Sequence, residues 1–252
     1  MPNAGAGIRL LPNAITVLAL CSGLSALKYA LGGNFTGSLA AVGLAALLDA
    51  LDGRLARLLD ATSRIGAELD SLADSISFGV APAVVLFIWS LGSTSVGWPV
   101  ALVFTVCAVL RLARFNTLLD NTETLPFTKE FFIGIPSPPG ALLALLPLTV
   151  FLQFGAGWWS SPWLVAAWTV VVALAMVSRI PTLSMKSVQV PARAVAPLLV
   201  LIAGLAATVI NFPFASLGVA LLLYLVHIPY AWYRYRWLAR NPSAWEVPPR
   251  QR

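Results

Sequence analysis

Four aspartates interrupt an apolar stretch of the sequence, residues 47–82, which reads LLDALDGRLARLLDATSRIGAELDSLADSISFGVAP. The first two are three residues apart and the last two are four apart, so each pair would project from one side of a helix. Four ionised carboxylates at membrane depth repel one another and lose hydration, which costs at least about 2.5 kcal/mol each. Hard divalent cations bind oxygen ligands and would bring four negative charges close to neutral. The pattern therefore predicts a metal site for Mg²⁺ or Mn²⁺, with two ions, at Asp49, Asp52, Asp70 and Asp74.

Small residues accompany both pairs of aspartates. On the first helix, Gly53 and Ala56 fall on nearly the same stripe as Asp49, and on the second helix Gly66 aligns with Asp70. Small side chains let a neighbouring helix or a flat ligand approach closely. If the two helices form an antiparallel hairpin through a short loop, the two carboxylate pairs can face each other.

Two other interpretations of these aspartates remain open from residue types alone. Aspartates at a membrane surface can cap helices or pair with arginines, and this is the interpretation that we give to Asp60 and Asp120. Intramembrane carboxylates can also line the pathway of a cation transporter. A transporter needs polar groups up to its outer face, whereas the connections 92–97 (GSTSVG) and 154–162 (FGAGWWSSP) carry no charge.

The composition is that of an integral membrane protein. Hydrophobic residues make up 59% of the 252 residues and charged residues 10%, and the mean hydropathy is +0.84. The connections between apolar runs are too short for a second domain, so we expect one all-α membrane domain over residues 1–252, with a lead at 1–12 and a flexible tail at 241–252. About eight transmembrane helices are predicted, starting near Asn13, Gly37, Leu69, Val96, Pro136, Pro162, Ala194 and Leu217.

The distribution of charge predicts the orientation. With eight spans and both termini in the cytoplasm, only Lys28 among the 16 basic residues falls at an outer end. The net charge of +6 then reflects orientation and attraction to anionic lipid head groups, and no nucleic acid is expected as a partner. We expect a multi-pass protein of the plasma membrane whose polar site faces the cytoplasm.

Further polar residues are expected in the same layer as the aspartates. Asn13 and Thr16 open the first helix, and Arg111 and Arg114 close the fourth. Ser137 lies between two prolines, which predicts an irregular loop that lines the substrate site. Each of these residues also has a purely structural interpretation, as a helix start or as a cytoplasmic anchor.

The chain resembles the CDP-alcohol phosphotransferase family. The stretches 11–16 (LPNAIT), 69–82, 111–116 (RLARFN) and 131–140 (FFIGIPSPPG) are similar to those of its membrane-embedded members that make phosphatidylserine. The resemblance covers roughly the first 140 residues. Its signature is matched at every defining position by Asp49-x2-Asp52-Gly53-x2-Ala56-Arg57-x8-Gly66-x3-Asp70-x3-Asp74.

The resemblance implies transfer of the phosphatidyl group of CDP-diacylglycerol to the hydroxyl of L-serine, which gives phosphatidylserine and CMP. It makes Asp49, Asp52 and Asp70 metal ligands, and Asp74 the general base with a possible ligand role. It also implies a helical bundle that forms a homodimer. The same chemistry with glycerol 3-phosphate or inositol phosphate as the acceptor remains the alternative.

The resemblance also suggests roles for the other polar and small residues. The candidates for binding serine are Arg111 and Arg114, whose positive charge suits the serine carboxylate, and Ser137, which is expected to line the substrate site. The nucleotide and its phosphates would be bound by Asn13, Thr16, Gly53, Ala56, Arg57 and Gly66.

Overall fold

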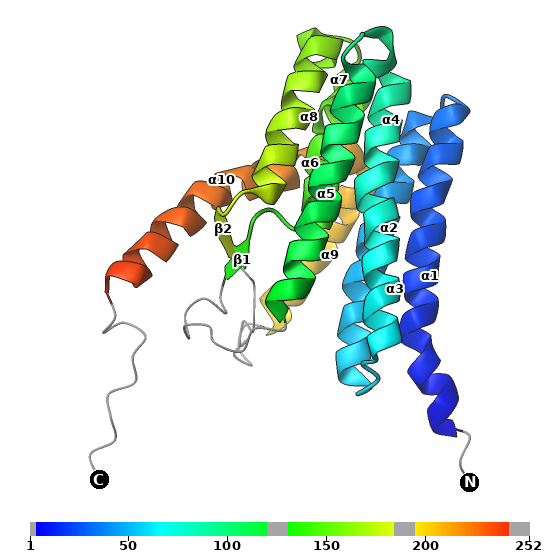
Figure 1. Cartoon of the computed structure of the whole chain (residues 1–252), viewed down its shortest axis with the longest axis vertical. Helices are drawn as coiled ribbons and strands as arrows, with labels where there is room; N and C mark the ends of the chain where they lie inside the picture. Colours follow the sequence, from blue (N-terminus) through cyan, green and yellow to red (C-terminus); the bar gives the residue numbers. More distant parts are fainter. Residues whose placement is uncertain (1–3, 120–130, 184–194, 242–252) are drawn as a thin grey trace.

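The computed structural model describes residues 4–119, 131–183 and 195–241, and these residues form a helical bundle with one small sheet (Figure 1). The elements in chain order are α1 (Ala4–Leu31), α2 (Phe35–Leu58), α3 (Arg64–Asp74), the π-helix η1 (Ser75–Val80), α4 (Ala81–Trp89), the 3₁₀ turn η2 (Leu91–Ser93), α5 (Gly97–Leu119), β1 (Phe131–Ile133), α6 (Ser137–Ala144), α7 (Leu146–Phe154), the 3₁₀ turn η4 (Trp158–Ser160), α8 (Pro162–Val177), β2 (Pro181–Leu183), α9 (Val195–Asn211) and α10 (Pro213–Arg240).

The prediction of an all-α, multi-pass membrane bundle is confirmed. Within the described residues, five helical units are long and apolar enough to cross a membrane, and α6 with α7 makes a sixth if this bent pair is one span. The shorter α8 and α9 are also apolar, so each predicted segment coincides with a helical unit. The count of eight spans stays a prediction. Helix α1 already begins at Ala4 and so includes most of the predicted lead, whereas the predicted tail beyond residue 241 lies outside the described residues.

The helices of the bundle run up and down between two ends. The turn between α2 and α3 and the last turn of α5 lie at one end, and the connections α1–α2, α4–α5 and α7–α8 lie at the other (Figure 1). Helix α1 packs along α2 and also against α3 and α4. The aspartate-bearing segments of α2 and α3 are therefore held at one end of the bundle by a shared neighbour.

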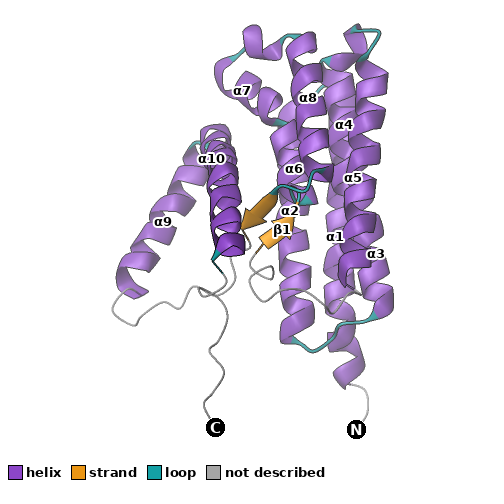
Figure 2. Cartoon of the chain, turned by 60° about the vertical axis from the view of Figure 1, so that its left-hand side comes forward, coloured by secondary structure: helices purple, strands orange, loops and turns teal. Residues whose placement is uncertain are grey.

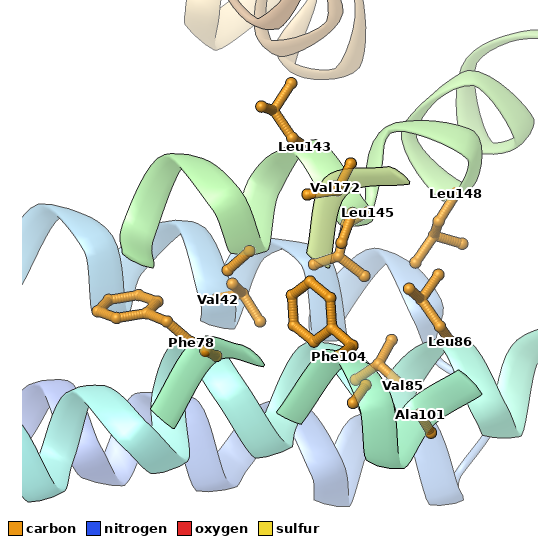
Figure 3. Close-up of a cluster of buried hydrophobic side chains, with 14 of the residues drawn as sticks. Val42, Phe78, Val85, Leu86, Ala101, Phe104, Leu143, Leu145, Leu148 and Val172 are labelled. Carbon is orange, nitrogen blue, oxygen red and sulfur yellow. The ribbon is translucent and has the colours of Figure 1, made fainter. Parts of the chain in front are cut away.

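A continuous apolar core joins the helices (Figure 3). Val42 of α2, Phe78 of η1 and Phe104 of α5 are fully buried and belong to one cluster with Leu145, at the break between α6 and α7, and Leu148 of α7. Large apolar side chains on the outer faces of α2, α5 and α8 are exposed, which suits helices that face lipid. Close packing of these buried groups fixes the positions of the polar residues near them.

Helices α3, η1 and α4 form one span from Arg64 to Trp89, with a π-helical segment directly after Asp74. The Ser77 hydroxyl in this segment donates to the carbonyl of Ala19 on α1 at 3.4 Å. Gly23 of α1 allows this approach, because a Cβ there would come within 2.7 Å of the Ser77 Cα. Single-turn π segments are frequent at functional sites.

The segment around Ser137 corrects one expectation. Ser137 is the first residue of helix α6, not part of an irregular loop. Pro136 precedes the helix, and the two prolines after Ser137 fall in its first turn, where backbone N–H groups need no helical partner. A bend of 44° separates α6 from α7, and Pro147 lies in the first turn of α7, where its ring favours a break.

A two-stranded antiparallel sheet, which the sequence did not predict, joins the segments before α6 and after α8. Phe131 pairs with Leu183 and Ile133 with Pro181. Gly134 follows β1 at φ +80°, a conformation that favours glycine. The sheet lies against α10, which crosses the bundle obliquely and forms a hairpin with α9 (Figure 2).

The contact between Gly23 and Ser77 gives a matched test of the packing. Gly→Ala inside a helix usually stabilises by about 1 kcal/mol. We expect Gly43→Ala to follow this rule, because a Cβ at Gly43 meets nothing within 4 Å. Gly23→Ala should instead lower the thermal midpoint in detergent, measured by fluorescence-detected size exclusion. Equal midpoints for the two variants would contradict the packing described here.

Candidate active site

Three carboxylates meet at one end of the bundle. Asp49 of α2 and Asp70 and Asp74 of α3 each offer an oxygen atom within 4.8 Å of the others, and all three side chains are partly buried. The carboxyls of Asp49 and Asp74 lie within hydrogen-bonding reach of each other. We call these three residues the carboxylate cluster. The expected facing of the two helices is thus observed.

The turn between α2 and α3 allows this meeting. Helix α2 ends at Leu58, and Ser63 caps the start of α3 by accepting a hydrogen bond from the Gly66 N–H at 3.0 Å. A serine side chain at this position satisfies an N–H group that has no partner inside the helix. The short connection then returns the chain antiparallel to α2, so Asp70 comes back to the level of Asp49.

Asp52 lies beside the cluster but points to a different partner. Its side chain is only 4% exposed, and it accepts a hydrogen bond from the Thr16 hydroxyl of α1 at 2.6 Å. Asp52 is still close enough to Asp49 and Asp70 to interact with both electrostatically. The structure therefore groups three of the four predicted ligands and fixes the fourth through Thr16.

The donor set of the cluster suits a hard divalent cation. Two unit charges 4.8 Å apart repel by on the order of 3.5 kcal/mol at an effective dielectric constant of about 20. Carboxylate oxygens are the ligands that Mg²⁺ and Mn²⁺ prefer, whereas zinc favours histidine and cysteine. A cation among the three side chains would turn this repulsion into attraction.

The small residues of the signature leave space or a close contact where a ligand would approach. A Cβ at Gly53 would meet nothing within 4 Å, so the helix surface beside Asp52 is open. A Cβ at Gly66 would lie 2.8 Å from the Asn13 amide oxygen, which places Asn13 directly over the start of α3. Arg57 is exposed one turn after Gly53, and Ala56 beside it is partly buried.

Arg111 of α5 and Ser137 of α6 form a buried pair. An Arg111 terminal nitrogen donates to the Ser137 hydroxyl at 2.9 Å, and the guanidinium lies 5.2 Å from the centre of the Phe115 ring. Arg111 is 9% exposed and interacts electrostatically with Asp49 and Asp74. Its Nε is buried and has no hydrogen-bond partner among the described residues. The structure thus brings a buried cation and a hydroxyl next to the carboxylate cluster.

The second arginine of this motif has a different partner. Arg114 donates to the carbonyl of Val177 at the end of α8, at 3.3 Å. Asn116 donates to the Ser71 hydroxyl of α3 at 2.8 Å, which ties the end of α5 to the aspartate-bearing helix. Of the predicted acceptor residues, Arg111 and Ser137 come together, and Arg114 faces α8.

Several contacts of the site were not predicted from the sequence. The bond from Thr16 to Asp52 joins residues 36 positions apart, and Thr16 was assigned to the nucleotide instead. Tyr224 of α10, whose hydroxyl is buried, interacts with Arg111, and the sequence does not predict this contact. Tyr224 lies in the apolar run LLLYLVH, where periodicity and composition give no signal for a polar role.

Comparison with known sequences identifies the class. The sequence profile of the CDP-alcohol phosphatidyltransferase family matches residues 9–163, so the chain belongs to this family. The match includes α2, α3 and the whole carboxylate cluster, and it ends at the start of α8.

Relatives that align with most of the chain have a more specific name. A protein of Mycobacterium leprae is 46% identical over 239 residues, which cover 95% of this chain and 80% of the relative. One of Mycobacterium tuberculosis strain H37Rv is 44% identical over 248 residues, 98% of this chain and 87% of the relative. One of Helicobacter pylori strain 26695 is 32% identical over 219 residues, 86% of this chain and 89% of the relative. All three are named CDP-diacylglycerol–serine O-phosphatidyltransferase.

Metal binding by the cluster can be measured without turnover. We expect purified protein to bind Mn²⁺, detected by the loss of the free-ion signal in electron paramagnetic resonance. Asp49→Asn should weaken this binding at least about tenfold, because it removes a charged ligand. Asp60→Asn is the matched control, since Asp60 is exposed in the α2–α3 turn. Equal Mn²⁺ affinity in the two variants would contradict a metal site at the cluster.

Proposed function

We propose that this protein transfers the phosphatidyl group of CDP-diacylglycerol to the hydroxyl of L-serine. The observation that carries the proposal is the carboxylate cluster beside the buried Arg111, in a chain whose 44–46% identical relatives are named for this reaction. Phosphoryl transfer depends mainly on positioning and electrostatic stabilisation, and a rigid helix pair with converging carboxylates supplies both.

The reaction forms one bond and breaks one. The serine hydroxyl oxygen attacks the phosphorus that carries the diacylglycerol, and the bond from that phosphorus to the CMP oxygen breaks, with the electron pair leaving on CMP. Asp74 is the base that accepts the proton of the hydroxyl, a role that we assign from the family resemblance, and its interaction with Arg111 keeps it close to the proposed serine site. Asp49, Asp70 and Asp52 would hold Mg²⁺ or Mn²⁺, two ions in all. When bound, these ions supply neutralisation of the diphosphate and stabilisation of the leaving group.

The nucleotide is placed on the exposed side of α2 and α3. The open surface at Gly53, with the partly buried Ala56 beside it, can take the flat cytosine ring, and Asn13 lies over Gly66 on the same side of the site. The planar fork of Arg57 matches two phosphate oxygens. Thr16 contributes by fixing Asp52 through their 2.6 Å hydrogen bond.

Serine is placed against Arg111 and Ser137. A buried guanidinium with an unpaired Nε is suited to a carboxylate, and its electrostatic contact with Asp74 brings the hydroxyl of a short amino acid near the base. The bond of Arg114 to Val177 favours Arg111 over Arg114 as the acceptor residue. Glycerol 3-phosphate and inositol phosphate carry an additional phosphate and would require further basic groups here.

The proposal includes the setting of the enzyme. Arg54, Arg57 and Arg64 surround the α2–α3 turn, at the end of the bundle that carries the carboxylate cluster. The positive-inside tendency supports a cytoplasmic position for this end. The plasma membrane is the location that we propose. A homodimer is proposed from the family resemblance, and its test is the molar mass of the protein in detergent by light scattering.

The reaction itself gives the first functional prediction. Proteoliposomes that contain the protein, CDP-diacylglycerol and labelled serine should make phosphatidylserine with Mg²⁺ or Mn²⁺, and should stop when a chelator is added. Asp74→Asn should lower kcat by at least about a hundredfold, because general-base catalysis contributes 10²–10⁴-fold. Product formed equally well with the chelator, or from glycerol 3-phosphate or inositol phosphate in preference to serine, would refute the proposed function.

Arg111 gives a second prediction. Arg111→Gln should raise the KM for serine by about ten- to a hundredfold, because a hydrogen-bonded charge contributes about 1.5–3 kcal/mol. The KM for CDP-diacylglycerol should stay within about twofold. Lys28→Gln is the control and should change neither value, because Lys28 lies in the last turn of α1, at the end of the bundle away from the carboxylate cluster. A parallel rise of both KM values would show that Arg111 has a general structural role instead.

A further inference from the structure

Helix α10 delivers a polar group to the site from outside the part of the chain that defines the family. The family profile ends at residue 163, whereas Tyr224 lies near the middle of α10. Helix α10 packs against α7 and against strand β2, so it closes the side of the bundle next to the small sheet (Figure 2). Tyr224 itself packs against the apolar core.

The Tyr224 hydroxyl is buried without a hydrogen-bond partner among the described residues. The hydroxyl of Thr182 is close enough to interact with the phenol, but no hydrogen bond of good geometry joins the two groups, and Thr182 donates its own proton to the Gly134 carbonyl at 3.1 Å. A buried phenol usually finds a partner, because an unmade hydrogen bond costs the full desolvation of the group. Among the described residues, the hydroxyl of Tyr224 is therefore a buried donor without a hydrogen bond of good geometry.

A second unpaired donor lies in the same region. The Nε of Arg111 is buried and unpartnered, while a terminal nitrogen of the same guanidinium is held by Ser137 at 2.9 Å. Arg111 and Tyr224 interact with each other electrostatically, and Arg111 interacts also with Asp74. Arg111 of α5, held by Ser137 of α6, thus brings a positive charge to the edge of the carboxylate cluster, and Tyr224 of α10 brings a neutral phenol donor.

Two unpaired donors, one of them cationic, are complementary to a small anion with two oxygen atoms. We propose that Tyr224 completes the acceptor subsite, where its hydroxyl and the Nε of Arg111 donate to the carboxylate of the amino-acid acceptor. This inference rests on the proposed function. Selectivity for the acceptor would then depend in part on α10, a helix that lies outside the residues matched by the family profile.

Tyr224 then distinguishes acceptors by their carboxylate. A site built to hydrogen-bond a substrate group discriminates against an analogue that lacks it, because the buried donors of the site stay unpaired. Serinol keeps the amine and the hydroxyl of serine and replaces the carboxylate by a hydroxymethyl group. The wild-type protein should therefore prefer serine to serinol, and the preference should depend on the Tyr224 hydroxyl.

The experiment compares Tyr224→Phe with wild type in proteoliposomes with CDP-diacylglycerol and Mg²⁺. The variant should raise the KM for serine by about tenfold, as expected for a hydrogen bond to a charged group. Its KM for CDP-diacylglycerol and its kcat should stay within about twofold, and its activity with serinol should not change. Tyr230→Phe is the matched control, since Tyr230 lies on the same helix and is 56% exposed.

The other outcomes separate the two levels of the proposal. An active wild type with an unchanged serine KM in Tyr224→Phe, or an equal loss with serine and serinol, overturns the role of Tyr224 alone. A wild type that makes no phosphatidylserine overturns the proposed function and this inference with it. If Tyr224→Phe is less stable, a double-mutant cycle with Arg111→Gln decides: non-additive effects on the serine KM support a shared carboxylate, and additive effects refute it.

Discussion

Electrostatic repulsion within the carboxylate cluster is the constraint on which the site depends. Asp49, Asp70 and Asp74 offer oxygens within 4.8 Å of one another in a partly buried position, where water screens charge less well than at a free surface. A fold that brings three ionised carboxylates together needs compensating positive charge, and the single charge of Arg111 cannot balance three negative charges. Divalent cations would provide that charge and would at the same time create a binding place for a diphosphate.

The site has two sides, which different helices of the bundle carry. Helices α1, α2 and α3 carry the acidic side, in which Thr16 fixes Asp52 and the Ser63 cap sets the direction of α3. Helices α5, α6 and α10 carry the cationic and hydroxyl side, built from Arg111, Ser137 and Tyr224. The apolar core of Figure 3 connects the two sides, so the packing of large side chains sets the distance between the carboxylate cluster and the Arg111–Ser137 pair.

The four aspartates of the acidic side could be predicted from the sequence, because they lie within one hairpin of 26 positions at helical spacing, whereas the contact of Asp52 with Thr16 of α1 could not. Local geometry is enough to place Asp49 opposite Asp70 once the turn is recognised. On the acceptor side, Arg111 and Ser137 were candidates from the sequence, but their pairing and the contact of Arg111 with Tyr224 could not be predicted, because both depend on tertiary packing between distant segments. The loop predicted at Ser137 was wrong because prolines in a first helical turn look like breakers in the sequence.

The central claim is that cations lie among the three carboxylates. Anomalous diffraction from crystals grown with Mn²⁺ and CDP-diacylglycerol tests it most directly. We expect at least one anomalous peak between Asp49, Asp70 and Asp74, at the roughly 2.0–2.2 Å that separates such ions from carboxylate oxygens. Peaks only elsewhere, or carboxylates turned away from one another at saturating Mn²⁺, would contradict it.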